Sequence, residues 1–421
     1  MIELALDPAA VIADLDELAA HSGGRFAGAK RLAWSPDWLA ARGWLRGKLE
    51  AIGLPITEDI AGNIWATVQG ATDDFLIVGS HIDAVPDGGW LDGVLGLMTA
   101  LEAVRRLAAL PAPPPVSIRF VDWADEEGAR FTRSLLGSSA CAGTLVPDDV
   151  RGLRDAGGIT LGDALASCGV DLDKATGATS SLAGAIAYVE LHIEQGPVLL
   201  GSGRLASAVS GTVGVERHLI TFSGQAAHAG STPMNVRRDT LAAAAQATLA
   251  IRESGIARGG VATVGNLAST PGVITAVAGR TEMQLDQRHL DKDALAAMLD
   301  DALSACRTAA DTFDCTLEVQ RVFGATPTPF HPALIAAARD AVAAAGGDDG
   351  DPIPSGPLHD ATEIGRLIPT AMIFAQSDPP LSHAKIENST DEALRIAINA
   401  YGRTVSWALN NTDALQGGVA Q

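Results

Sequence analysis

The sequence predicts an α/β protein: a mainly parallel sheet with helices on both faces, interrupted by an inserted α+β domain. Three features support this fold class. Short apolar, β-prone runs alternate with helical segments up to about residue 212, a different order of strands and helices follows, and an apolar strand-like run returns at 371–375. Alternating strands and helices are typical of a parallel sheet that helices cover on both sides.

The elements of the main domain follow from apolar periodicity and from the residues that end each element. Apolar residues at helical spacing predict helices, and the proline-rich segment 111–115 ends one of them. Continuous apolar runs predict buried strands. The expected order is a helix at 37–52, strands at 63–68 and 75–80, a helix at 93–110, and strands at 116–121, 188–191 and 371–375.

The middle of the chain has a different pattern. Its expected order, βαββαβ, is that of the split βαβ sandwich. We therefore expect a main domain made of 1–212 and 325–421, with an inserted domain at 213–324. The expected elements of the insert are a strand at 217–222, a helix at 237–254, strands at 260–266 and 281–286, a helix at 292–313 and a strand at 315–322.

One turn-rich segment, GSHIDAVPDGGWLDG at 79–93, places a histidine and aspartates directly behind an apolar strand. Because the carboxyl ends of parallel strands deliver side chains into a crevice, His81 and Asp92 are candidate metal ligands. Asp83 could hold the other imidazole N–H of His81 and fix its tautomer. Taken alone, this pattern fits a hydrogen-bonded polar loop better than a metal site.

Similar groups follow three further apolar runs. They are Glu126 and Glu127 in DWADEEG, His192 in HIEQGP and His383 in SDPPLSH. Two divalent cations a few ångströms apart need a shared carboxylate and about two nitrogen or oxygen ligands each. One aspartate, one glutamate and three histidines meet this need. The other glutamate of the adjacent pair can then take a proton from water.

Composition excludes several classes of protein. The 421 residues are 47% hydrophobic, enough for a large core and two domains. A net charge of −20 without any Lys/Arg-rich run argues against nucleic acid or an anionic membrane as partner. There is no signal-like N-terminal segment and no apolar run of roughly 18 residues. The four cysteines lack CxxC spacing, so we expect reduced thiols in a cytoplasmic protein.

Ordered motifs along nearly the whole chain resemble one family, the amidase/hydantoinase/carbamoylase group of dinuclear-zinc aminoacylase-like hydrolases. This group includes allantoate amidohydrolase, N-carbamoyl-L-amino acid hydrolase and β-ureidopropionase. The resemblance implies a zinc exopeptidase-like main domain, and an insert that serves as lid and dimerisation surface. The matching segments are GSHIDAVPDGGWLDGVLG, DEEGARF, GSSACAG, HIEQGPVL, SGQAAHAGSTPMNVRRD, LDQRH, SGPLHDA and LSHAKIENS.

The resemblance also implies a role for each candidate metal ligand. His81, Asp92 and His192 would hold one ion, and Asp92, Glu127 and His383 the other, with Asp92 bridging. Glu126 would be the general base. The cofactor is then two divalent ions per subunit, with zinc expected and manganese, cobalt or nickel as alternatives.

The implied substrate-binding positions are Gln195, His228 and Arg288, with Arg288 receiving a substrate carboxylate and His228 reaching the active site of the partner in a homodimer. Each has another interpretation from the residues alone. Gln195 could be a turn residue, His228 could cap a loop, and Arg288 could form an interdomain salt bridge. His359 is expected to support the site from behind, as Asp83 is.

Three positions depart from the family's pattern. Thr275 stands where an asparagine is usual, Pro380 replaces a glycine, and Trp90 replaces a basic residue. A threonine hydroxyl cannot offer the two-sided hydrogen bonding of an amide, and a proline removes a backbone donor. The resemblance places all three in the implied substrate pocket and none among the metal ligands, so these departures bear on specificity rather than on metal binding.

The function predicted from this pattern is metal-dependent hydrolysis of a linear C–N bond, in the carbamoyl or ureido group of a small carboxylate such as an N-carbamoyl amino acid. Glu126 would act as base and His228 would stabilise the oxyanion. Two alternatives remain at this point. One is an N-acyl amino acid or dipeptide hydrolase, and the other is a metal-dependent binding protein without catalysis.

Overall fold

The computed structural model describes residues 1–348 and 350–415, which form two compact units. The first unit, here called the main unit, consists of Met1–Gly211 together with the chain from Phe330 onward, and the second, the inserted unit, is Thr212–Pro329. The sequence placed the insert at 213–324. In the structure the second boundary lies later, at Pro329, four residues after the last long strand of the insert ends at Ala325.

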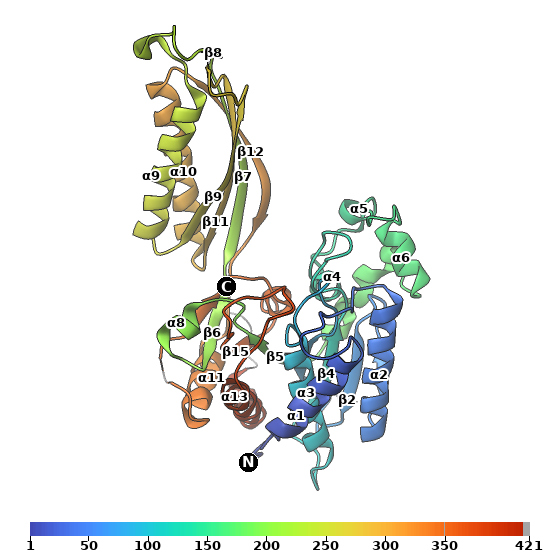
Figure 1. The fold of residues 1–421 in the computed structure, drawn as a ribbon. Helices are drawn as coiled ribbons and strands as arrows, with labels where there is room; N and C mark the ends of the chain where they lie inside the picture. The colour runs from blue at the N-terminus through green and yellow to red at the C-terminus, as the bar shows by residue number, and fades with distance from the viewer. Residues whose placement is uncertain (349, 416–421) are drawn as a thin grey trace. The chain divides into compact units, whose positions relative to one another are not determined.

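The main unit is built on a mixed, mainly parallel sheet (Figure 1). Its strand order is β1-β2-β4-β3-β5-β15-β6-β13, with β14 paired to β6. The central strands β4, β3, β5 and β15 are parallel, whereas β2 and β6 pair antiparallel at the flanks. The strands of this sheet are β1 Ile56–Glu58, β2 Ile64–Val68, β3 Phe75–His81, β4 Ser117–Trp123, β5 Ala185–Ile193, β6 Ala206–Thr212, β14 Ile353–Ser355 and β15 Thr370–Ala375, together with the short β13 Thr328–Pro329, whose residues are the last two of the range given above for the inserted unit.

Both faces of this sheet are covered. Every residue of β3 and β15 is buried, which requires packing on either side of the strand. Helices α3 and α13 pack against the central strands, as does α12. The helices of this unit are α1 Pro8–Ala20, α2 Pro36–Ile52, α3 Val94–Ala108, α4 Leu136–Ala142, α5 Pro147–Val150, α6 Leu161–Ser167, α7 Leu172–Ala175, α8 Val198–Ser202, α11 Pro332–Ala344, α12 Asp360–Ile364 and α13 Asp391–Asn410, with 3-10 turns at Thr176–Leu182 and Thr412–Ala414.

Local sequence explains the ends of the long helices. Ser35 caps α2 by accepting the N–H of Trp38, and the helix stops at Gly53, whose φ of 81° suits glycine. Thr390 caps α13 in the same way. The short helices between 136 and 202 were not predicted, because segments of four to seven residues are too short to show a helical period.

The inserted unit is an antiparallel four-stranded sheet with two helices against it (Figure 1). The strand order is β12-β7-β11-β9, and a separate apolar core joins the sheet to the helices. This is the predicted βαββαβ order. The elements are β7 Gly214–Ser223, α9 Thr240–Ala257, β9 Val261–Thr270, β11 Arg280–His289, α10 Lys292–Thr312 and β12 Thr316–Ala325, together with the small pair β8 Ala227–His228 and β10 Ala276–Val277 and a 3-10 turn at Met234–Val236.

Within the described part of the chain, no helix is both long enough and apolar enough to cross a bilayer.

Candidate metal centre

The candidate ligands meet where the parallel strands of the main unit end. His81 is the last residue of β3, and His192 lies near the end of β5. Glu127 follows β4, and His383 follows β15. Since neighbouring parallel strands end at the same edge of a sheet, residues far apart in sequence are brought together there.

The first group consists of His81, Asp92 and His192. Asp92 Oδ1 lies 3.2 Å from His192 Nε2 and 3.9 Å from His81 Nε2. All three side chains are buried. One ligand atom from each lies within 4.8 Å of the others, which is close enough to surround a single cation.

The second group uses the other oxygen of the same aspartate. Asp92 Oδ2 lies 3.4 Å from His383 Nε2, and Glu127 Oε2 lies 3.2 Å from the same nitrogen. These three ligand atoms again lie within 4.8 Å of one another. The structure therefore brings all five residues predicted as metal ligands into two groups that share Asp92.

Two of these residues carry buried polar atoms without any partner. His81 Nε2 and Glu127 Oε1 accept and donate no hydrogen bond in the structure. A buried polar atom without a partner costs about 1–3 kcal/mol, so native proteins rarely keep one. His81 Nε2 belongs to the first group and Glu127 to the second, so a pair of cations would satisfy both residues. The donor set of imidazoles and carboxylates suits zinc, manganese, cobalt or nickel.

The electrostatics of the histidines follow their surroundings. Burial lowers the pKa of His81 to about 3. Burial alone would also lower the pKa of His192, but its hydrogen bond with Asp92 raises that pKa to about 9. Likewise, the hydrogen bond with Glu127 raises the pKa of His383 to about 9. In both cases the neighbouring carboxylate stabilises the positively charged form of the imidazole ring.

Asp83 supports the centre in a way that differs in detail from the prediction. His81 Nδ1 faces the backbone oxygen of Asp83 at 3.2 Å, while the carboxylate lies 3.6 Å away. That carboxylate instead accepts the backbone N–H groups of Glu126 and Glu127, each at 3.2 Å. Asp83 thus ties the loop after β3 to the loop after β4. Residue 93 has to be a glycine, because a Cβ at this position would lie 2.3 Å from the His81 ring.

Glu126 lies beside the first group without belonging to it. Its Oε2 is 3.8 Å from His81 Nε2, and only 7% of the residue is exposed. Burial, followed by the nearby charges of Asp360 and Glu127, raises the pKa of Glu126 well above its usual range. A carboxylate with a raised pKa and no metal-binding duty is suited to accepting and returning a proton.

His359 lies directly behind a ligand. Its ring centroid is 4.4 Å from that of His192, and its Nε2 lies 3.0 Å from Ser355 Oγ. Burial lowers its pKa well below the usual value, so the ring is neutral. His359 occupies the supporting position expected from the sequence, at the N-terminus of α12.

Gln195 and Ser382 contact the shared carboxylate. Gln195 Nε2 donates to Asp92 Oδ2 at 2.8 Å and to Ser382 Oγ at 3.0 Å. Sequence reasoning treated Gln195 as a substrate-binding residue and did not single out Ser382. It also missed Arg31, whose buried guanidinium donates to the Ile82 oxygen at 2.7 Å. The sequence offered one sign of a role for Ser382, its place immediately before His383. For Arg31 the only sign was its place in an N-terminal loop.

In the inserted unit, His228 and Thr275 lie together. His228 pairs with Ala276 across β8 and β10, and the Ala229 N–H donates to the Thr275 oxygen at 2.8 Å. His228 is exposed, and its Nδ1 accepts the backbone N–H groups of Gly230 and Ser231 at 3.1 and 3.2 Å. Because Nδ1 accepts these two bonds, the ring proton lies on Nε2.

Arg288 lies in the four-stranded sheet of the same unit, near the C-terminal end of β11. It pairs with Val215 at the start of β7, and its Nε donates to Asp286 Oδ1 at 2.8 Å. Arg217 binds the other oxygen of Asp286 at 2.7 Å. One carboxylate thus holds two arginines on β7 and β11.

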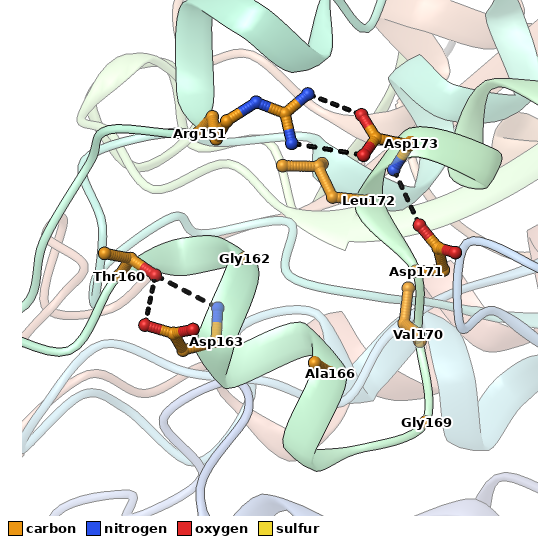
Figure 2. A pocket seen from close by; sticks show the side chains of 10 residues that line it. All are labelled: Arg151, Thr160, Gly162, Asp163, Ala166, Gly169, Val170, Asp171, Leu172 and Asp173. Atoms are coloured by element: carbon orange, nitrogen blue, oxygen red, sulfur yellow. Dashed lines mark hydrogen bonds and ion pairs between the residues drawn. The ribbon is translucent and has the colours of Figure 1, made fainter.

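A surface pocket of about 510 Å³ lies elsewhere in the main unit (Figure 2). Its polar groups are already paired: Arg151 binds Asp173, and the Thr160 hydroxyl binds Asp163. None of the residues that line it belongs to the two ligand groups. We therefore place the candidate site at the strand ends.

A sheet of this kind, with two ligand groups that share one carboxylate, defines a metal-dependent hydrolase. Residues 77–407 match the family described as peptidase family M20/M25/M40, and the chain belongs to this family. The predicted fold class is confirmed, as is the resemblance to amidases of the hydantoinase/carbamoylase type.

Two relatives and one solved structure indicate which kind of hydrolase the chain is similar to. The chain is 35% identical over 385 residues to the N-carbamoyl-L-amino acid amidohydrolase of Geobacillus stearothermophilus, covering 91% of this chain and 93% of that one. It is 33% identical to the allantoate amidohydrolase of Escherichia coli (strain K12), covering 87% and 90%. The crystal structure of an amidase of the hydantoinase/carbamoylase family from Burkholderia multivorans matches with a TM-score of 0.87 at 29% identity, covering 96% and 99%.

Proposed function

We propose that this protein is a metal-dependent amidohydrolase that cleaves a linear C–N bond, in the carbamoyl or ureido group of an N-carbamoyl amino acid or a related ureido acid. One observation carries the proposal: two ligand groups share Asp92, and the buried carboxylate of Glu126 lies beside them. The names of the relatives, N-carbamoyl-L-amino acid amidohydrolase and allantoate amidohydrolase, support this substrate class.

Divalent cations held by the two groups would supply a water of lowered pKa and a Lewis acid for the substrate oxygen. Glu126 then has two tasks. It accepts a proton from the attacking water, and it returns that proton to the leaving nitrogen. Hydrolysis of a carbamoyl substrate in this way gives the free amino acid and carbamate. The carbamate then decomposes to ammonia and carbon dioxide.

His228 is proposed to stabilise the negative oxygen that forms at the attacked carbonyl. Its Nδ1 is occupied by two backbone N–H groups, so Nε2–H is the available donor. A donor whose orientation is fixed in advance stabilises developing charge without reorganisation at the moment of reaction. This role and the turn-capping role of the same ring are compatible, because they use different nitrogens.

Arg288 is proposed to bind the substrate carboxylate, and Gln195 to orient the substrate next to Asp92. The Asp286 carboxylate accepts from both Nε and Nη2 of Arg288, at 2.8 and 3.3 Å, which fixes the plane of the guanidinium. A planar, fixed guanidinium suits bidentate binding of a carboxylate. Thr275 lies beside His228, and we propose that it contributes to selectivity there.

We further propose a homodimer in which His228 serves the active site of the other subunit. Arg280, which pairs with Ser223 at the end of β7 next to β8, is eight residues from Arg288 along β11. At about 3.3 Å per residue, Arg288 and the His228 end of the unit are roughly 26 Å apart. One copy of this unit therefore cannot bring both side chains to one small substrate. Exposed apolar side chains along α9 and β9, such as Leu249 and Val261, offer a surface for pairing.

Zinc is the proposed metal and the cytoplasm the proposed location; both remain predictions. The decisive experiment for function is a substrate screen with metal-reconstituted protein. N-carbamoyl amino acids, ureidoglycolate-type compounds, allantoate and N-acyl amino acids would be tested, with ammonia and amine measured separately. We expect ammonia from ureido acids. Hydrolysis of N-acyl amino acids alone, or binding of ureido acids without turnover, would overturn the proposal.

A further inference from the structure

A buried carboxylate, Glu387, lies between the two loops that carry the shared ligand and the last histidine. The residue is 0% exposed. Its Oε1 accepts the backbone N–H groups of Leu91 at 3.2 Å and of Asp92 at 3.0 Å. Glu387 therefore fixes the backbone at the one residue that both ligand groups use.

The other oxygen of Glu387 connects to the second loop. The Ser382 hydroxyl binds Glu387 Oε2 and also lies 2.9 Å from Asp92 Oδ2. Ser382 directly precedes His383, which adopts a positive φ of 56°. Through this one carboxylate, the Asp92 loop and the His383 loop are joined at both backbone and side-chain level.

The Asp92 loop is shaped to receive this carboxylate. A Cβ at Gly89 would lie only 1.9 Å from Glu387 Oε1, which is far inside van der Waals contact. The glycine is therefore required for space, since its φ lies outside the left-handed region where glycine is favoured for conformation. Trp90 closes the same loop from the other side by donating to Asn388 Oδ1 at 3.2 Å.

We propose that Glu387 is a positioning residue that assembles the two ligand groups by locking the Asp92 loop to the His383 loop. The proposal rests on the proposed metal-dependent function, because it concerns the same centre. Partners that orient ligands typically change metal affinity by about 10- to 100-fold when removed. Glu387 orients two ligands at once, so both sites should respond.

The test measures metal affinity by competition with a chromophoric zinc chelator. Glu387→Ala should weaken zinc binding by about 10- to 100-fold. Glu387→Gln should stay within a few fold of the unmodified protein, because its carbonyl oxygen still accepts the two N–H groups and its amide donates to Ser382. Glu392→Ala, at an exposed acidic residue five positions on, is the matched control and should leave affinity unchanged.

Gly89→Ala provides an independent variant that leaves the carboxylate in the chain but displaces it. It should weaken zinc binding as Glu387→Ala does, and it decides the matter if Glu387→Ala does not fold. Wild-type affinity in these variants, while the unmodified protein binds two ions, would overturn the role of Glu387 alone. Failure of the unmodified protein to bind two ions would overturn the proposed function itself.

Discussion

The two units of the chain hold their functional residues in opposite ways. In the main unit, the candidate ligands are packed at the ends of parallel strands and contact one another, as Asp92 does with His192 and His383. In the inserted unit, His228 lies in the small β8–β10 sheet and Arg288 in the four-stranded sheet, and each is held by local bonds. A substitution in the main unit should therefore affect several ligands at once, whereas a substitution at His228 or Arg288 should leave the other residue in place.

The largest effect is expected from Asp92→Ala. Because both ligand groups use Asp92, the variant should lose both ions and all measurable activity. Metal content by elemental analysis after dialysis checks this. Retention of one tightly bound ion in this variant would contradict the expectation, because it would show that one group holds its ion without the shared carboxylate.

Glu126→Gln should separate chemistry from metal binding within the same unit. Glu126 belongs to neither ligand group, so two ions should remain bound. Loss of the base should lower kcat by about 10²- to 10⁴-fold. Steady-state kinetics and metal analysis on one preparation test the loss of kcat and the retention of both ions. A kcat near that of the unmodified protein would exclude Glu126 as the base.

Arg288→Lys should act on substrate binding and leave the metal centre alone. A lysine keeps the charge but loses the planar fork, and a hydrogen bond to a charged group contributes about 1.5–3 kcal/mol. We expect kcat/KM for an N-carbamoyl amino acid to fall by about 10- to 100-fold, with unchanged metal content. Equal loss for a substrate analogue without a carboxylate would argue against the assigned role.

The smallest effects concern the four cysteines, two in each unit. Cys141 and Cys306 are buried, and burial raises the pKa of Cys306 to about 12, whereas Cys168 and Cys315 are partly exposed. In the native protein, maleimide should label the latter pair first. In rising urea, Cys306 should react before Cys141, because the inserted unit has the smaller apolar core. Mass spectrometry of labelled peptides gives the order.

The strands could be predicted from the sequence because their apolar runs had to be buried, and the candidate ligands were found in the segments at and after the ends of these runs. His81 after Phe75–Val78 is the clearest case. Glu387 was beyond reach because its partners, Leu91 and Asp92, lie almost 300 residues earlier, and only the folded loops bring them together. The hydrogen bonds from the Glu126 and Glu127 N–H groups to Asp83 could not be predicted either, since they depend on the path of the backbone after β4.

The side chain of His383 is 53% exposed, while those of His81 and His192 are 1% exposed. One ion would therefore be sealed in the interior and the other would sit at the surface of the protein. A dilute chelator should strip the outer position first and leave a singly loaded form. The concentration of free metal around the protein would then set the fraction of molecules that carry both ions.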